Sequence, residues 1–105
     1  MIHHVVYFQL NPEVDKATVE DLVRTSRSLL LKIPEVLGVR SGRNLDPECQ
    51  WQFYFAIEVD SLEKLRITMD DAFHLKLLEK VIKPHTSAQF SMDYELDPSR
   101  DLKYS

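Results

Sequence analysis

The sequence predicts a single α+β domain in which helices cover one face of a four-stranded antiparallel sheet. Segments with strand alternation and segments with helical periodicity follow one another in the order strand, helix, strand, strand, helix, strand. Right-handed crossovers place both helices on the same side of such a sheet. The 105 residues contain no linker, repeat or low-complexity tract, so they are expected to form one domain.

The first elements are a strand and a long helix. Residues 2–10 alternate between two faces that both carry apolar side chains, so both faces are expected to be at least partly buried. Asn11 and Pro12 end this strand. Asp15 is a candidate N-cap for a helix over residues 16–33, which Pro34 stops.

Two strands are expected in the middle of the chain, over residues 36–44 and 51–59. Gly38 and Gly42 are weak points of the first. One face of the second is predicted to carry Trp51, Phe53, Phe55, Ile57 and Val59. Three aromatic rings on one face need a large partner surface, which is either the internal core or a subunit interface.

The second helical region is predicted to be split. Ser61 caps a short helix that ends near Thr68 or Met69, and Asp71 caps the next helix, over residues 72–83. Pro84 ends that helix.

The last strand is predicted over residues 87–96, where apolar and polar side chains alternate. The domain therefore covers residues 1–96, and residues 97–105 form a polar C-terminal tail. This order of elements is the ferredoxin-like arrangement. Because the helices cover only one sheet face, the apolar side chains of the other face must be buried by something else, and a second copy of the chain is the simplest candidate.

Composition excludes several classes of partner. Apolar residues make up 44% and charged residues 29% of the chain, as in a soluble globular protein, and the net charge is −4. The basic residues are scattered, so we expect no nucleic acid partner. No apolar run or signal segment points to a membrane, and the expected location is cytoplasmic. Cys49 is the single cysteine and forms neither an internal disulfide nor a multi-cysteine metal site.

His74 is the leading candidate for function because it lies in an apolar helical stripe. The residues predicted on its side of the helix are Leu77, Leu78, Val81 and Ile82. A buried imidazole needs a hydrogen-bond partner or lines a cavity. Burial and the helix N-terminus disfavour the charged ring, whereas Asp70 and Asp71 favour it. A neutral ring can accept a proton as a general base, and the alternative is a satisfied core histidine.

His4 is the proposed partner of His74, because its strand face also carries Val6 and Phe8 and is expected to pack beneath the helices. Asp93 orients a histidine, anchors backbone amides or stays solvated on the polar face of the last strand. His3 points to the opposite face of the sheet. Two histidines without identifiable carboxylate ligands are a poor metal site, so no metal is expected.

Three groups of segments resemble the stress-responsive alpha/beta barrel family, also called the dimeric A/B barrel or Dabb domain. They are residues 1–12 (MIHHVVYFQLNP), residues 33–36 (IPEV) with 42–44 (GRN), and residues 73–74 (FH) with 82–85 (IKPH) and 92–94 (MDY). The resemblance implies a stress-responsive homodimer whose two sheets pack face to face. It also implies a pocket between each sheet and its own helices.

Some members of this family, notably plant polyketide cyclases, carry out cofactor-free aldol cyclisation. The resemblance matches the two histidines that flank their substrate to His4 and His74. The chain departs from these cyclases at Thr68, where they carry tyrosine, and at Asp71 and Ala72, which replace a common His-Pro pair.

Three functional hypotheses follow. The first is a module that binds a small hydrophobic or carbonyl-containing molecule in a pocket lined by Val6, Phe8, Thr68 and Leu78. The second is a cofactor-free cyclase or isomerase in which His74 is the general base and His4 assists it. The third is a related barrel monooxygenase that activates oxygen through its own substrate. No flavin or haem signal is present, and no cofactor is expected.

Overall fold

The computed structural model describes residues 1–97, and it has the predicted element order. The strands are β1 (Ile2–Leu10), β2 (Gly38–Arg43), β3 (Phe53–Val59) and β4 (Thr86–Glu95). The helical elements are α1 (Lys16–Leu30), α2 (Leu62–Asp70), α3 (Ala72–Lys76), η1 (Leu77–Ile82) and η2 (Lys83–His85). Apart from Asp97, the predicted tail at 97–105 lies outside the described residues.

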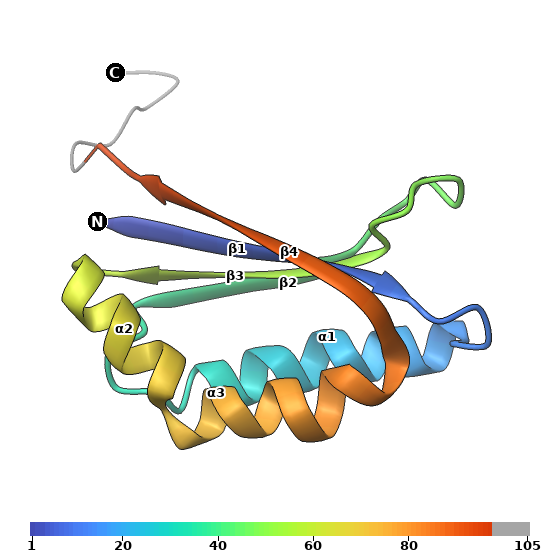
Figure 1. Ribbon diagram of the computed structural model, residues 1–105, viewed down its shortest axis with the longest axis horizontal. Helices are drawn as coiled ribbons and strands as arrows, with labels where there is room; N and C mark the ends of the chain where they lie inside the picture. Colours follow the sequence, from blue (N-terminus) through green and yellow to red (C-terminus); the bar gives the residue numbers. More distant parts are fainter. Residues whose placement is uncertain (98–105) are drawn as a thin grey trace.

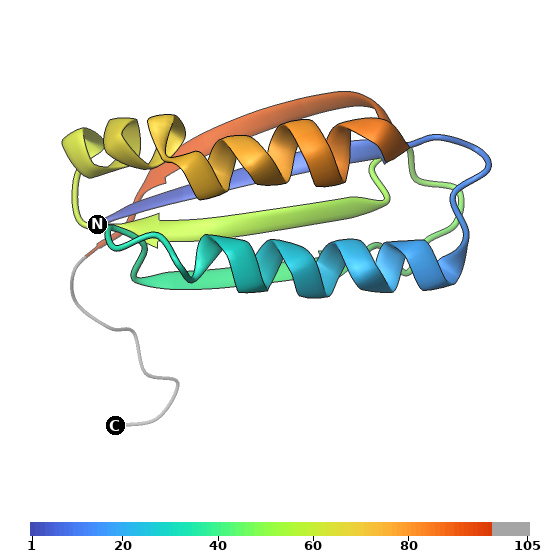
Figure 2. The same cartoon turned by 90° about the horizontal axis from the view of Figure 1, so that it is seen from below.

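The four strands form one sheet in the order β2-β3-β1-β4, and all neighbouring strands are antiparallel. Both helical regions lie on the same face of this sheet (Figure 1). Seen from below, α1 runs alongside α3 and the turns that follow it (Figure 2). The predicted ferredoxin-like fold is therefore confirmed. No helix within residues 1–97 is long and apolar enough to cross a membrane.

The first helix is shorter than predicted. It begins after Asp15, whose carboxylate accepts a hydrogen bond from the Thr18 amide, but it ends at Leu30 rather than at residue 33. The amide of Ile33 donates to Leu30, three residues earlier, as in a tight turn. Pro34 disfavours helical geometry in the residue before it, which explains the early end. Ile33 is nevertheless fully buried.

The helix predicted over residues 72–83 forms, but it is not α-helical throughout. Ordinary α-helical geometry ends at Lys76, and a π-helical segment follows as η1. The Lys83 amide donates to the carbonyl of Leu78, five residues earlier. This wider turn puts Leu77 and Ile82, five residues apart, on the buried side, while Leu78 and Val81 are only partly buried.

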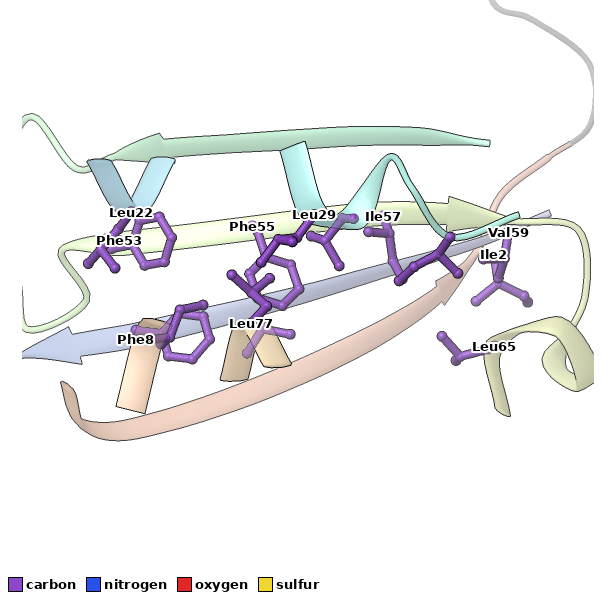
Figure 3. Close-up of a cluster of buried hydrophobic side chains, with 14 residues drawn as sticks. Ile2, Phe8, Leu22, Leu29, Phe53, Phe55, Ile57, Val59, Leu65 and Leu77 are labelled. Atoms are coloured by element: carbon purple, nitrogen blue, oxygen red, sulfur yellow. The ribbon is translucent and has the colours of Figure 1, made fainter. Parts of the chain in front are cut away.

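The hydrophobic core lies between the sheet and the helices (Figure 3). At one end, the ring of Phe8 packs against the rings of Phe53 and Phe55, with centroids 5.5 and 5.6 Å away. Leu65 of α2 lies at the other end, near Ile2 and Val59 (Figure 3). The alternation of β1 and β3 predicted this helix-covered face correctly.

Trp51 is the exception to that alternation. It precedes β3, and its ring contacts Phe90 at a centroid distance of 4.6 Å. Phe90 belongs to the opposite, uncovered face, where it also stacks on Tyr7 at 5.0 Å. Because β3 begins at Phe53, after Trp51, the prediction that the Trp51 side chain shares one strand face with Phe53 is wrong.

The uncovered face of the sheet is apolar and aromatic. Phe90, Met92 and Tyr94 of β4 are 36%, 38% and 48% exposed. A hollow of about 470 Å³ on this face is lined by His3, Val5, Tyr7, Arg40, Tyr54, Ala56, Glu58 and Leu96. His3 lies on this face, as predicted, with its ring 6.5 Å from that of Tyr94.

Candidate functional site

His4 of β1 is held by a carboxylate from the adjacent edge strand. Its Nδ1 atom hydrogen-bonds to Oδ1 of Asp93. The two residues are direct partners in the β1–β4 register, so their side chains leave the same face of the sheet. The His4 side chain is buried, whereas that of Asp93 is about half exposed, at 47%. Asp93 therefore orients a histidine and also stays in contact with solvent, so two of the predicted alternatives hold together.

His74 is held in place by the interruption of helical geometry between α2 and α3. Asp71 is in an extended conformation between the two helices, and its carboxylate accepts a hydrogen bond of 2.7 Å from the Phe73 amide. The break brings the carbonyl of Met69 to Nδ1 of His74, at 3.0 Å. The His74 residue is only 4% exposed. The predicted N-cap at Asp71 is confirmed, and it fixes where the imidazole lies.

The surroundings of His74 favour its neutral form. Burial lowers the pKa of His74 below its ordinary value, and the nearby His4 lowers it further. The Met69 carbonyl and the carboxylates of Asp71 and Asp70 act in the opposite direction without reversing the shift.

Both imidazoles leave the same nitrogen without a protein partner. Each Nδ1 faces an acceptor, so the proton of a neutral ring lies on Nδ1, and Nε2 carries a free lone pair. Within residues 1–97, Ser26 Oγ is the only fully enclosed side-chain oxygen or nitrogen without a hydrogen bond. The arrangement offers two proton-transfer atoms from two different elements.

The four predicted lining residues lie in different surroundings. Val6 and Phe8 are buried members of the core. Thr68 is fully buried, and its hydroxyl donates to the Lys64 carbonyl at 2.8 Å. Leu78 is partly buried and lines a hollow of about 360 Å³ between η1 and the start of β4, together with Glu79, Lys83 and residues 86–89. Val6 is thus nearest to His4 along β1, while Phe8 and Leu78 belong to the region beyond it.

Sequence reasoning missed the Met69 carbonyl as a partner of His74. A backbone carbonyl has no sequence signature, although the predicted break at Asp70 and Asp71 marks where helical carbonyls become free. Within residues 1–97, no group of three or more histidine, cysteine, aspartate or glutamate side chains is placed to hold a metal ion.

Comparison with known proteins identifies the family. The model of the Dabb family, the stress responsive A/B barrel domain, matches residues 2–96. The chain belongs to the Dabb family. No curated protein matches the sequence. The resemblance found in the sequence is thus confirmed over the whole sheet and both helical regions.

Solved structures share the fold of this Dabb domain at low sequence identity. A dimeric ferredoxin-like protein of unknown function from Thermobifida fusca is 23% identical, with a TM-score of 0.79 over 90% of both chains. A Dabb-family protein of Mesorhizobium loti is 19% identical, with a TM-score of 0.77 over 90% of this chain and 95% of that chain. A hydroxynitrile lyase from Passiflora edulis is 11% identical, with a TM-score of 0.76 over 95% of this chain and 96% of that chain.

Proposed function

We propose that this Dabb protein binds a small carbonyl compound at His4 and His74 and moves a proton on it without a cofactor. One observation carries the proposal: both rings are anchored through Nδ1, by Asp93 and by the Met69 carbonyl, so that both Nε2 atoms are free. A general base needs a free lone pair on an oriented ring. The buried, apolar neighbours of the two rings suit a small ligand of low polarity.

The two rings differ in their surroundings, and this difference assigns their roles. His74 is the base, because burial and its neighbour His4 keep it neutral near pH 7. His4 has the Asp93 carboxylate at Nδ1, which fixes the orientation of its ring. His74 Nε2 then removes a proton from the carbon next to the carbonyl, which gives the enolate, and His4 holds the ligand beside it.

The proposal includes a homodimer. The uncovered face exposes aromatic and apolar side chains of β4, and residues 1–97 supply no element that covers them. The structurally similar protein from Thermobifida fusca is described as dimeric. Two copies packed through this face would bury the apolar side chains of both sheets.

A second candidate, binding without turnover, is favoured by Thr68. Its hydroxyl is engaged by the Lys64 carbonyl and is not free for a ligand. No side-chain hydroxyl from α2 is then available to assist proton transfer by the imidazoles, and binding alone needs none. The hydroxynitrile lyase and the antibiotic biosynthesis monooxygenase among the similar structures show that this fold supports enzymes, but they share only 11% and 17% of residues with this chain.

Hydrogen–deuterium exchange of acetophenone separates the two candidates. Removal of a methyl proton gives the enolate, and return of a deuteron from heavy water gives the labelled ketone, so loss of the methyl proton signal reports the base. We expect the wild-type protein to accelerate this loss, and His74→Gln to reduce the rate to that of buffer. His85→Gln, outside the site, is the matched control. If the wild-type exchange rate equals that of buffer while the ketone shifts the NMR signals of His4 and His74, the protein binds the ketone without turning it over.

A further inference from the structure

The chain contains only two glycines, and both lie on the uncovered face of the sheet. Gly38 and Gly42 belong to the edge strand β2 and pair with Glu58 and Tyr54, which line the larger hollow of that face. Glycine weakens a strand, and its presence there often marks a place where another group approaches closely. Neither glycine has a positive φ, so the backbone conformation of β2 does not require them.

Packing within the described chain explains Gly42 but not Gly38. A Cβ atom at Gly42 would lie 3.1 Å from the ring of Tyr54, which is closer than an ordinary contact. Apart from its chain neighbours, a Cβ atom at Gly38 would meet nothing nearer than the Glu58 carboxylate, at 4.0 Å. A hollow of about 140 Å³ lies here, lined by His3, Gly38, Val39, Arg40, Ala56 and Glu58. Because a cavity of about 150 Å³ can hold a benzene ring, the space beside Gly38 has the size of one aromatic side chain.

The opposite half of the same face carries a ridge of large, exposed side chains, namely Phe90, Met92 and Tyr94 of β4. The register of the four strands arranges this face in three rows, each at one level along the strands. The rows are Tyr94–His3–Glu58–Gly38, Met92–Val5–Ala56–Arg40 and Phe90–Tyr7–Tyr54–Gly42. Two of the three rows therefore run from an aromatic ring on β4 to a glycine on β2.

A two-fold axis between two such sheets can run across the strands or along them. If it runs across the strands, each strand meets its own copy, so the ridge of one sheet meets the ridge of the other. If it runs along the strands through the middle of the order β2-β3-β1-β4, β4 of one copy meets β2 of the other, and each row meets its own copy in reverse. Of the two arrangements, the second sets the ridge of each copy against the glycines of the other.

We infer that the space beside Gly38 receives the ring of the partner's Tyr94, in a dimer in which β4 of each copy lies over β2 of the other. This inference rests on the homodimer included in the proposed function. The same register sets Glu58 opposite the partner's His3. Within residues 1–97, neither the Glu58 carboxylate nor the His3 ring has a hydrogen bond or an ion pair. Since an imidazole N–H donates to a carboxylate whether the ring is neutral or charged, the two copies complement each other in polarity as well as in shape.

Enlarging Gly38 tests the inference on the full-length protein. In Gly38→Phe, the new ring occupies the space that the partner's Tyr94 needs. We expect the dimer dissociation constant, measured by analytical ultracentrifugation, to rise about hundredfold, with a factor of about ten for each of the two symmetric contacts. Leu37→Phe is the matched control, because it adds a ring at the neighbouring exposed position, which lines neither hollow. This control should dimerise like the wild type.

A mixing experiment identifies what occupies the space beside Gly38. In a heterodimer of Gly38→Phe with Tyr94→Ala, each of the two contacts holds one ring, so neither a clash nor a void remains. Native mass spectrometry of the equimolar mixture should therefore show more heterodimer than either homodimer. A second measurement separates dissociation from unfolding. Added to Phe90→Asp, whose charge on this face should keep the chain monomeric, Gly38→Phe should not lower the melting temperature, because no side chain fills that space.

Each remaining outcome counts against the inference. A Gly38→Phe protein that dimerises as tightly as the wild type would overturn it and leave the dimer of the proposed function standing. A weakened Gly38→Phe dimer that forms no excess of heterodimer with Tyr94→Ala would overturn it as well, because Tyr94 would not be the occupant. If the wild-type protein is monomeric at all concentrations, the inference and the proposed dimer both fall.

Discussion

His4 on the first strand and Asp93 on the last are joined by a hydrogen bond between Nδ1 and a carboxylate oxygen. They are neighbours across the β1–β4 ladder, so the sheet itself aligns them. The bond fixes the orientation of a buried ring from a position that is half exposed to solvent. An edge strand thus determines which nitrogen of His4 is free for a ligand.

Removing this carboxylate should change the tautomer of His4 more than the stability of the protein. In Asp93→Ala, Nδ1 loses its acceptor, and the neutral ring is expected to populate both tautomers, which long-range proton–nitrogen NMR spectra resolve. The free energy of unfolding should fall by only about 0.5 kcal/mol, because half exposure weakens the interaction. Glu95→Ala changes a carboxylate on the same strand face and should leave the His4 spectrum unaltered. An unaltered spectrum in Asp93→Ala would contradict the assignment.

The lowered pKa of His74 makes stability depend on pH in a defined direction. At pH 8 the ring is neutral in both the folded and the unfolded chain. As the pH falls through about 6.5, the unfolded chain binds a proton first, so the free energy of unfolding decreases. The loss stops below the lowered pKa of the folded state. Urea titrations between pH 8 and pH 5 should show a smaller decrease in His74→Gln than in wild type, and His85→Gln should retain the wild-type contribution of His74.

The two adjacent aspartates before His74 should behave differently when replaced. Asp71 caps α3 through the Phe73 amide, whereas Asp70 is the last residue of α2 and makes no such bond. Asp71→Ala should lower the free energy of unfolding by about 1 kcal/mol, as expected for a lost N-cap. Asp70→Ala should lower the free energy of unfolding by clearly less. Because Asp71 raises the pKa of His74, its removal should lower that pKa further in an NMR titration. Equal destabilisation by the two substitutions would show that the cap has no special role.

Most of the fold followed from local sequence signals, because alternation and capping are local. The face of β1 that carries His4 and Phe8, and the caps at Asp15, Ser61 and Asp71, were all predictable. The errors arose where geometry changes without a local signal. A π-helical turn after Lys76 uses ordinary helix-forming residues, so the periodicity of 3.6 placed Leu78 and Val81 too deep.

The candidate site was predictable only in part. The approach of His4 and His74 follows from two periodicities and one packing assumption. The hydrogen bond between His4 and Asp93 joins residues that are 89 positions apart in sequence. It depends on the register of β1 and β4, which alternation alone does not specify.

The uncovered sheet face allows the proposed dimer to be tested with two neighbouring positions of one strand. Phe90 lies on this face, where it stacks on Tyr7, while Gln89 points to the helix side and is exposed. Phe90→Asp places a charge within the proposed interface, and desolvating an unpaired carboxylate is costly. We therefore expect Phe90→Asp to sediment as a monomer in analytical ultracentrifugation, and Gln89→Asp to remain a dimer.

Both variants should keep the circular dichroism spectrum of the wild type, because neither side chain contributes to the core between the sheet and the helices. A Phe90→Asp protein that remains dimeric would show that the copies associate through another surface. A wild-type protein that sediments as a monomer at all concentrations would exclude the face-to-face barrel. In either case the hollow beside His3, Arg40 and Glu58 would be open to solvent instead of enclosed between two sheets.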